Sequence, residues 1–226
     1  EKTIKIPSTV HTIGDSAFHS CKELTSIKIP NSVTSIGESA FRLCSGLKSI
    51  EIPNSVTSIG DFVFSYCSEL TSATIGNSVT SISEFAFYNC SKLTSVTIGN
   101  SVTTIGMCAF ESCSKLTSIE IPNSVTSIGN DAFYNCRELT LIEIPNSVKH
   151  IGKNAFKNCN PNLEIIRDTE DIETIKEDLK ITNNMENIEK IKEDLINFGK
   201  KYSGGKDFLN SIRGTSLREL FDNISP

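Results

Sequence analysis

One segment of about 23 residues recurs through the first three quarters of the chain, and this repeat restricts the possible folds more than any other feature. Its clearest marker is a cysteine that returns every 23 residues, at Cys21, Cys44, Cys67, Cys90, Cys113, Cys136 and Cys159. A phenylalanine three residues earlier keeps the same step, at Phe18, Phe41, Phe64, Phe87, Phe110, Phe133 and Phe156. A fixed period of roughly 20 to 29 residues is typical of solenoids, whose repeats stack as coils. The period therefore predicts about seven stacked coils.

Each part of the repeat has an expected place in its coil. In the sequence LTSIKIP, Ile27 and Ile29 alternate with polar residues, which predicts a short strand with one face in the core. Pro30 is expected to end that strand because proline lacks the backbone donor that a ladder needs. Gly37 is expected to permit a sharp bend. A single coil cannot bury its apolar residues alone, so stacking at about 5 Å per coil is required.

The repeat resembles the BspA-like leucine-rich repeat family, whose pattern is I-P-x-S-V-x-x-I-G-x-x-A-F-x-x-C-x-x-L. The match covers residues 4–167. The resemblance implies a right-handed solenoid with a parallel β-sheet on its concave face and short helical or irregular turns on its convex face. It also implies a cell-surface or secreted adhesion protein. We therefore expect an α/β fold, with the solenoid at residues 1–167 and a small α-helical region after it.

The remaining segment, 168–226, breaks the period and resembles no family that we recognise. Ile172, Ile175 and Leu179 recur at helical spacing, and two further amphipathic stretches follow. The first helix is expected to cap the last coil, because the end of a solenoid needs a cover. The others are compatible with a separate module, a dimerising hairpin that gives self-association, or a linker.

The seven-cysteine column is interpreted as structural. Cysteines stacked about 5 Å apart have parallel Cβ vectors, which do not suit a disulfide, and an odd number cannot pair completely. Spacing of 23 residues is also unlike that of a zinc site. We expect reduced, buried thiols that pack as small apolar groups and make weak hydrogen bonds to carbonyl oxygens. Cys108 stands where other repeats have polar residues, and it is expected nearer the surface, as a tolerated substitution.

Composition excludes several classes of function. The net charge of −5 and the pI of about 5.3 argue against nucleic-acid binding. No apolar run is long enough for a membrane-spanning helix. His11 and His19 are expected at the opposite end of the stack from His150, and no catalytic set, metal cluster or cofactor motif occurs. We predict a protein without enzymatic activity and without a cofactor.

Two surfaces are candidates for binding a protein partner. The first is the outward column of the predicted concave sheet: Lys5, Lys28, Glu51, Thr74, Thr97, Glu120 and Glu143. This column contains no aromatic anchor, so it could equally be a solvated face. The second is a convex patch in adjacent coils, formed by Leu43, Phe62, Tyr66 and Phe85. These side chains could instead pack along the convex edge or beneath the tail.

The sequence supports two hypotheses about function. The favoured one is a cell-surface or secreted adhesion module that binds host or neighbouring-cell proteins. The alternative is an intracellular interaction scaffold, in which the helical tail recruits partners or dimerises. The partner is expected to be a protein in both cases.

Overall fold

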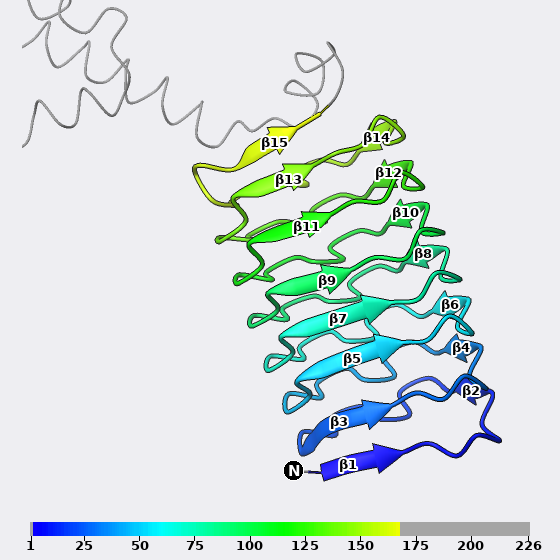
Figure 1. Ribbon diagram of the computed structural model, residues 1–226. Coiled ribbons are helices and arrows are strands. Elements are labelled where there is room, and N and C mark those ends of the chain that lie inside the picture. The colour runs from blue at the N-terminus through cyan, green and yellow to red at the C-terminus, as the bar shows by residue number, and fades with distance from the viewer. Residues whose placement is uncertain (1, 168–226) are drawn as a thin grey trace, which may run out of the picture. The chain divides into compact units, whose positions relative to one another are not determined.

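The computed structural model describes residues 2–167, which form a stack of coils wound one upon the next (Figure 1). Each coil contributes one strand to a column of longer strands, which we call the longer column. The strand forms because its alternating isoleucines bury one of its faces. The strands of this column are β1 (Lys2–Lys5), β3 (Leu24–Lys28), β5 (Ser49–Ile52), β7 (Ser72–Ile75), β9 (Ser95–Thr97), β11 (Ser118–Glu120), β13 (Leu141–Glu143) and β15 (Glu164–Ile166). We call the outer side of this column the strand face.

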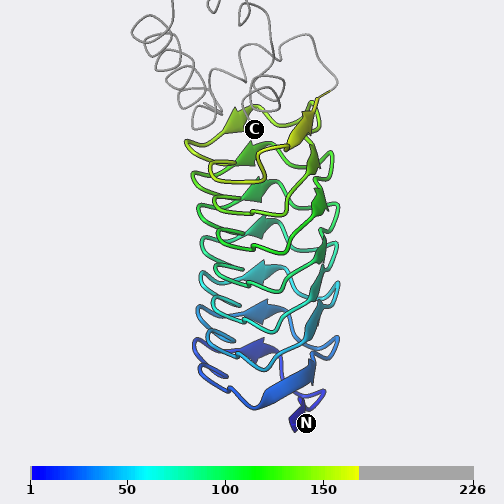
Figure 2. The ribbon, with the colours of Figure 1, turned by 90° about the vertical axis from the view of Figure 1, so that its left-hand side faces the viewer.

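A second column of two-residue strands lies after the Pro-Asn-Ser turn, and the sequence did not predict it. Its strands are β2 (Thr12–Ile13), β4 (Ser35–Ile36), β6 (Ser58–Ile59), β8 (Ser81–Ile82), β10 (Thr104–Ile105), β12 (Ser127–Ile128) and β14 (His150–Ile151). Turned by 90°, the stack shows both columns along its length (Figure 2). The fold is therefore a parallel β-solenoid with two strand columns per coil.

Strand pairing is parallel throughout the described residues and keeps the repeat in register. Ile50 pairs with Ala73 and Ile119 with Ile142, a step of 23 residues in both cases. The longer column is divided into the sheets β1-β3, β5-β7-β9 and β11-β13-β15, and the shorter column into β2-β4-β6 and β8-β10-β12-β14. Because the step equals the repeat, each position of the repeat stacks on the same position in the next coil.

The third side of each coil, residues 38–45 in the second coil, is built from turns. We call this side the turn face. No helix occurs within residues 2–167, so of the two expected forms, helical or irregular turns, this part of the chain has the irregular one, and the α part of the expected α/β fold is absent from it. The cause lies in the backbone: two residues per coil, such as Ser39 and Leu43, have φ near +60°. A left-handed residue ends an α-helix, and two of them four positions apart leave no room for one.

The core is a set of continuous side-chain columns. The phenylalanine rings from Phe18 to Phe156 stack along the axis at centroid distances of 5.1–5.4 Å. Phe41, Phe64, Phe87, Phe110 and Phe133 are fully buried. Stacked isoleucine, valine and leucine residues fill the rest of the interior. The predicted core columns are confirmed.

The repeated glycine that follows the short strand serves close stacking of the coils. A Cβ atom added at Gly60 would lie 2.4 Å from the backbone N of Glu38 and 2.5 Å from the carbonyl carbon of Gly37. Such contacts are too short for real side chains. The sequence-based explanation, a sharp bend, is therefore replaced by a different one: adjacent coils touch at this corner, and any side chain would separate them.

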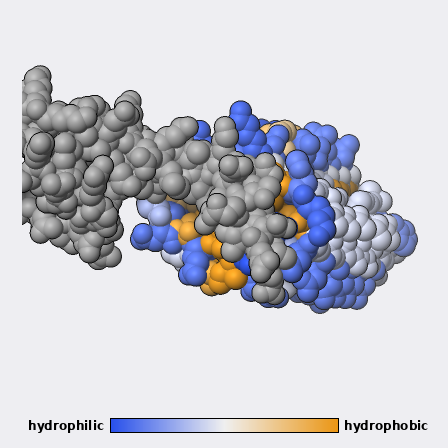
Figure 3. All heavy atoms as spheres, turned by 90° about the horizontal axis from the view of Figure 1, so that it is seen from above, coloured by the Kyte–Doolittle hydropathy of each residue, from blue (hydrophilic) through white to orange (hydrophobic). Residues whose placement is uncertain are grey.

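The last coil departs from the repeat in a way that changes one expectation. Leu163 is displaced by one residue from the 23-residue step. A displacement that continued into the strand would place Arg167 in the outward column. In the structure Glu143 pairs with Ile166, so the displacement ends before the strand. Leu141 and Ile166 are each 41% exposed, and apolar side chains gather at this end of the solenoid (Figure 3).

The predictions for segment 168–226, namely the helices, the cap and self-association, lie outside the described residues.

Candidate protein-binding surfaces

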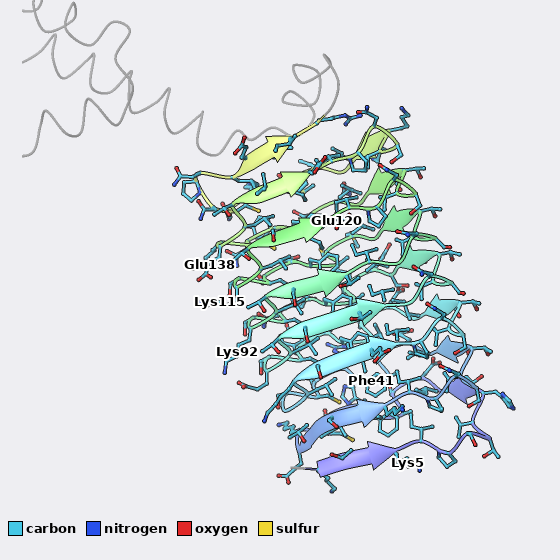
Figure 4. The ribbon with its side chains drawn as sticks, in the orientation of Figure 1. Lys5, Phe41, Lys92, Lys115, Glu120 and Glu138 are labelled. Atoms are coloured by element: carbon cyan, nitrogen blue, oxygen red, sulfur yellow. The ribbon has the colours of Figure 1, made fainter. Side chains whose placement is uncertain are left out.

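The predicted outward column lies on the strand face, as expected. All seven residues from Lys5 to Glu143 are exposed. Lys5 and Glu120 lie toward opposite ends of the face (Figure 4). Along the column, two lysines are followed by Glu51, then by two threonines and two further glutamates. Glu51, Thr74 and Thr97 also line a shallow groove at the ends of β5, β7 and β9.

The edge of the strand face carries two ion pairs between neighbouring coils. Lys92 Nζ lies 2.7 Å from a carboxylate oxygen of Glu69, and Lys115 pairs with Glu138. All four side chains are roughly half exposed, and such pairs contribute little to stability. These charges are neutralised within the chain. The charges at this edge therefore offer mostly weak contacts to a partner.

The predicted convex patch lies on the turn face and forms part of a larger cluster. Phe62 and Phe85 stack with their ring centroids 4.7 Å apart. Tyr88 packs edge-on against Phe85 at 5.7 Å and against Tyr66 at 5.3 Å. The Arg42 guanidinium lies over the Phe62 ring, 5.2 Å from its centroid. These five residues, with Leu43 of the preceding coil, are the turn-face cluster.

Each side chain of the turn-face cluster remains partly exposed. Burial and the neighbouring Tyr66 raise the pKa of Tyr88, and the nearby Glu111 adds to the effect. Neither Arg42 nor Tyr88 belongs to the patch that was predicted from the sequence. Both occupy the position directly after the core phenylalanine of their coil. A comparison of this position across the repeats would have identified them from the sequence. Aromatic and arginine side chains are the groups that most often dominate binding at protein interfaces.

The backbone beneath the cluster is strained. Leu43, Phe62, Tyr66 and Phe85 have φ of 61°, 56°, 62° and 54°. This left-handed region costs an ordinary L-residue about 1–2 kcal/mol and is tolerated best by glycine, asparagine and aspartate. Other coils place serine, cysteine, asparagine or aspartate at the same two positions, as at Asn135. Four bulky side chains therefore occupy these costly positions in consecutive coils.

Two polar groups beneath the cluster lack hydrogen-bond partners. Ser65 is fully buried, and its hydroxyl oxygen contacts no donor or acceptor. The Nε atom of Arg42 is likewise buried without a partner. Unsatisfied buried polar atoms cost free energy, and they are uncommon in well-packed interiors. Such atoms also occur outside the cluster, at Ser55, Ser147 and Arg167, so the bulky residues at left-handed positions are the feature that distinguishes this part of the turn face.

The cysteine column connects successive coils. The Cys44 thiol donates to the carbonyl oxygen of Phe18 at 3.0 Å, and the five following cysteines repeat this contact at 3.1–3.2 Å. Burial raises the pKa of Cys90 to about 12. The thiols from Cys44 to Cys136 are buried, while Cys21 and Cys159 at the two ends are partly exposed. The reduced state stays a prediction, which thiol titration of the unfolded protein without reductant would test.

Cys108 lies nearer the surface than the buried thiols of the column, as expected, but it is not an exposed surface residue. It is 7% exposed, whereas Cys44 to Cys136 of the column are fully buried. Burial raises the pKa of its thiol to about 12, and the neighbouring Glu111 adds to the shift. The residue has φ of 53°, at the same left-handed position as Phe85 in the preceding coil. A protonated, buried thiol is a poor nucleophile.

Within residues 2–167, no group of histidine, cysteine or acidic side chains is arranged to hold a metal ion. In the same part of the chain, no helix is long and apolar enough to cross a membrane.

The stacked parallel strands and turn-built third face define the chain as a leucine-rich repeat solenoid. Comparison with protein families gives a match to the BspA-type leucine-rich repeat region, in six copies, over residues 2–117 and 80–202. The chain belongs to this family. The resemblance seen in the repeat pattern is thereby confirmed.

Solved bacterial structures share the fold. A leucine-rich repeat protein from Bacteroides ovatus is 33% identical, with a TM-score of 0.65 over 80% of this chain and 52% of that one. One from Eubacterium ventriosum is also 33% identical, with a TM-score of 0.65 over 70% of this chain and 42% of that one. The T. pallidum leucine-rich repeat protein is 26% identical, with a TM-score of 0.68 over 80% and 84%.

This chain spans about half the length of the first two of these structures. A comparison with curated proteins gives no significant match.

Proposed function

We propose that the protein is a non-enzymatic adhesion module, displayed at a cell surface or secreted, that binds another protein through the turn-face cluster. Leucine-rich repeat families generally serve as interaction modules, which supports the class of function. The surface location is inferred from the family alone. A host protein or a protein of a neighbouring cell is the proposed partner.

The observation that carries the proposal is the turn-face cluster itself. Phe62, Phe85 and Tyr88 keep part of their rings in solvent while the backbone at Phe62 and Phe85 is held in an unfavourable conformation. Every coil has this backbone conformation, but the bulky residues that suit it least are gathered in one region. This points to function, because stability alone would favour asparagine or aspartate there. The strand face is the second candidate, with its charged residues but without an aromatic anchor.

A pull-down from host or neighbouring-cell surface proteins tests which face binds. The unchanged chain is compared with Phe62→Ser/Phe85→Ser on the turn face and with Lys28→Glu/Glu120→Lys on the strand face. The proposal predicts a captured protein that is lost only with the phenylalanine pair. Loss only with the charge pair would move the site to the strand face. Capture of no protein by the unchanged chain would contradict the proposed function.

A further inference from the structure

A ridge of acidic side chains runs beside the turn-face cluster. The residue immediately before the first left-handed position is acidic in four consecutive coils: Asp15, Glu38, Asp61 and Glu84. In the next two coils this position holds Met107 and Asn130, and in the last it holds Lys153. The acidic ridge therefore coincides with the coils that carry the cluster, and it is adjacent in sequence to both stacked phenylalanines.

The ridge is fixed in place by the backbone. Asp15 Oδ1 accepts a hydrogen bond from the backbone N–H of Glu38 at 2.8 Å, and Asp61 Oδ1 accepts one from that of Glu84 at 3.1 Å. Each of these aspartates has a second carboxylate oxygen that can accept from a partner. Asp61 and Glu84 are exposed. Next to the Phe62–Phe85 stack, the Asp61 carboxylate is therefore oriented by its hydrogen bond, and Glu84 is exposed to a partner.

A third carboxylate, that of Glu111, lies near Tyr88 in the next coil. Glu111 follows Tyr88 in the column after the core phenylalanine, and it is close enough to contribute to the raised pKa of Tyr88. The cationic group within the cluster, Arg42, is already positioned over the Phe62 ring. The cluster is therefore an apolar and aromatic surface between carboxylates. Its charge is opposite to that of a lysine- or arginine-rich segment.

We infer that the turn-face cluster recognises a basic segment of its partner protein, in which apolar side chains pack on Phe62 and Phe85 while neighbouring lysine or arginine side chains contact Asp61, Glu84 and Glu111. This inference rests on the proposed function and names its partner chemistry. Aromatic faces add to the selectivity, because they attract cations as well as apolar groups.

Fluorescence anisotropy with two labelled probe peptides tests this inference. One short peptide alternates lysine with leucine and serine, and the other has glutamate in place of every lysine. The lysine peptide is expected to bind at least about tenfold more tightly at low salt. Most of that preference should disappear as salt screens the exposed carboxylates. Equal binding of the two peptides, or a preference that is independent of salt, would overturn the inference.

Paired variants assign the effect to residues. Asp61→Asn/Glu84→Gln keeps the shape of the ridge and the acceptor oxygen that binds the Glu84 N–H, and it should reduce the preference for the lysine peptide about tenfold. The matched control, Glu120→Gln/Glu143→Gln, removes two charges from the strand face and should leave the preference unchanged. Equal effects of the two variants would mean that net charge alone attracts the peptide, which would overturn the inference.

The variant Phe62→Asn/Phe85→Asn separates this inference from the proposed function. Asparagine suits the left-handed backbone, so a thermal melt can show that the variant is folded. It should bind neither the lysine peptide nor the captured protein. If the captured protein is lost but the lysine peptide still binds normally, the inference about partner chemistry fails while the proposed site stands. The matched control is Tyr134→Ser, which removes an aromatic ring at the position equivalent to Tyr88, two coils away and outside the cluster. It should leave binding of the lysine peptide unchanged.

Discussion

Phe62 and Phe85 show how a single residue can work against the repeat that contains it. Their backbone positions are held left-handed by the turn that every coil repeats, so the side chains cannot change that conformation. Stacking returns about 0.5–1.5 kcal/mol, which is less than the combined cost of two unfavourable backbone conformations. Stacking and backbone strain therefore oppose each other, and burial of the inner faces of the rings offsets the part of the strain that stacking does not.

Replacing this pair with asparagine should therefore change stability little. In Phe62→Asn/Phe85→Asn, relief of backbone strain offsets the lost stacking and burial, so we expect a change of at most about 1–2 kcal/mol in the free energy of unfolding. A urea melt of the variant and the unchanged protein measures this. A loss as large as that of a core substitution would show that the rings are structural.

Phe110 provides that core reference. It is fully buried between the rings of Phe87 and Phe133. Phe110→Ala should lower the free energy of unfolding by about 3–5 kcal/mol, because it leaves a cavity inside a continuous column. Exposed Lys28→Ala and Glu120→Ala should each change it by less than about 0.5 kcal/mol. Similar unfolding midpoints for all three variants would show that the inward and outward columns are misassigned.

At the scale of the element, the corner glycines test the spacing of the coils. An alanine Cβ at Gly60 would collide with the backbone of the preceding coil, whereas one at Gly14, in the first coil, would meet nothing within 4 Å. Gly60→Ala should therefore destabilise the protein by several kcal/mol, of the order seen for severe packing changes. Gly14→Ala should be neutral or stabilising by about 0.4–1 kcal/mol. Thermal melts compare the two, and equal effects would contradict the close-approach explanation.

The cysteine column predicts a loss of stability in alkali. Burial raises the pKa of Cys44, Cys90 and Cys159 to about 12, whereas an unfolded thiol titrates near about 8.5. The thiols of the unfolded chain lose their protons at lower pH than those of the folded chain. The stability that the protonated thiols give the folded chain is therefore complete below about pH 8.5, and it declines as the pH rises toward 12. Urea melts from about pH 7 to 10.5 measure the decline. Cys90→Val should make the free energy of unfolding fall less steeply with pH. An unchanged pH dependence in this variant would contradict the assignment of the decline to the buried thiols.

Sequence reasoning predicted elements wherever the repeat itself carries the signal. The longer strands and the phenylalanine and cysteine columns follow from a step of 23 residues, and adjacency of Phe62 and Phe85 follows from the same step. The left-handed turns were not predicted, because serine, leucine and phenylalanine in some coils obscure the signal that asparagine gives at the same positions in others, as at Asn135. Cys108 lies nearer the surface than the cysteine column, as polar residues elsewhere in its own column suggested, but the turn leaves it largely buried.

At the scale of the whole molecule, the solenoid separates stability from binding. Parallel ladders and continuous core columns carry the fold through every described coil, so each surface column is free to vary from coil to coil. The strand face varies in charge, while the turn face concentrates aromatic side chains in its middle coils. The regular repeat reveals the fold, and its local exceptions indicate the surface proposed for binding.

The most direct test of this account is the affinity of the captured partner for the unchanged chain and for Phe62→Asn/Phe85→Asn, measured with melts of both proteins. The account predicts that the dissociation constant rises at least about a hundredfold, equivalent to about 2.8 kcal/mol, while the unfolding midpoint changes little. Unchanged affinity in a folded variant would contradict it and remove the turn-face cluster as the binding site.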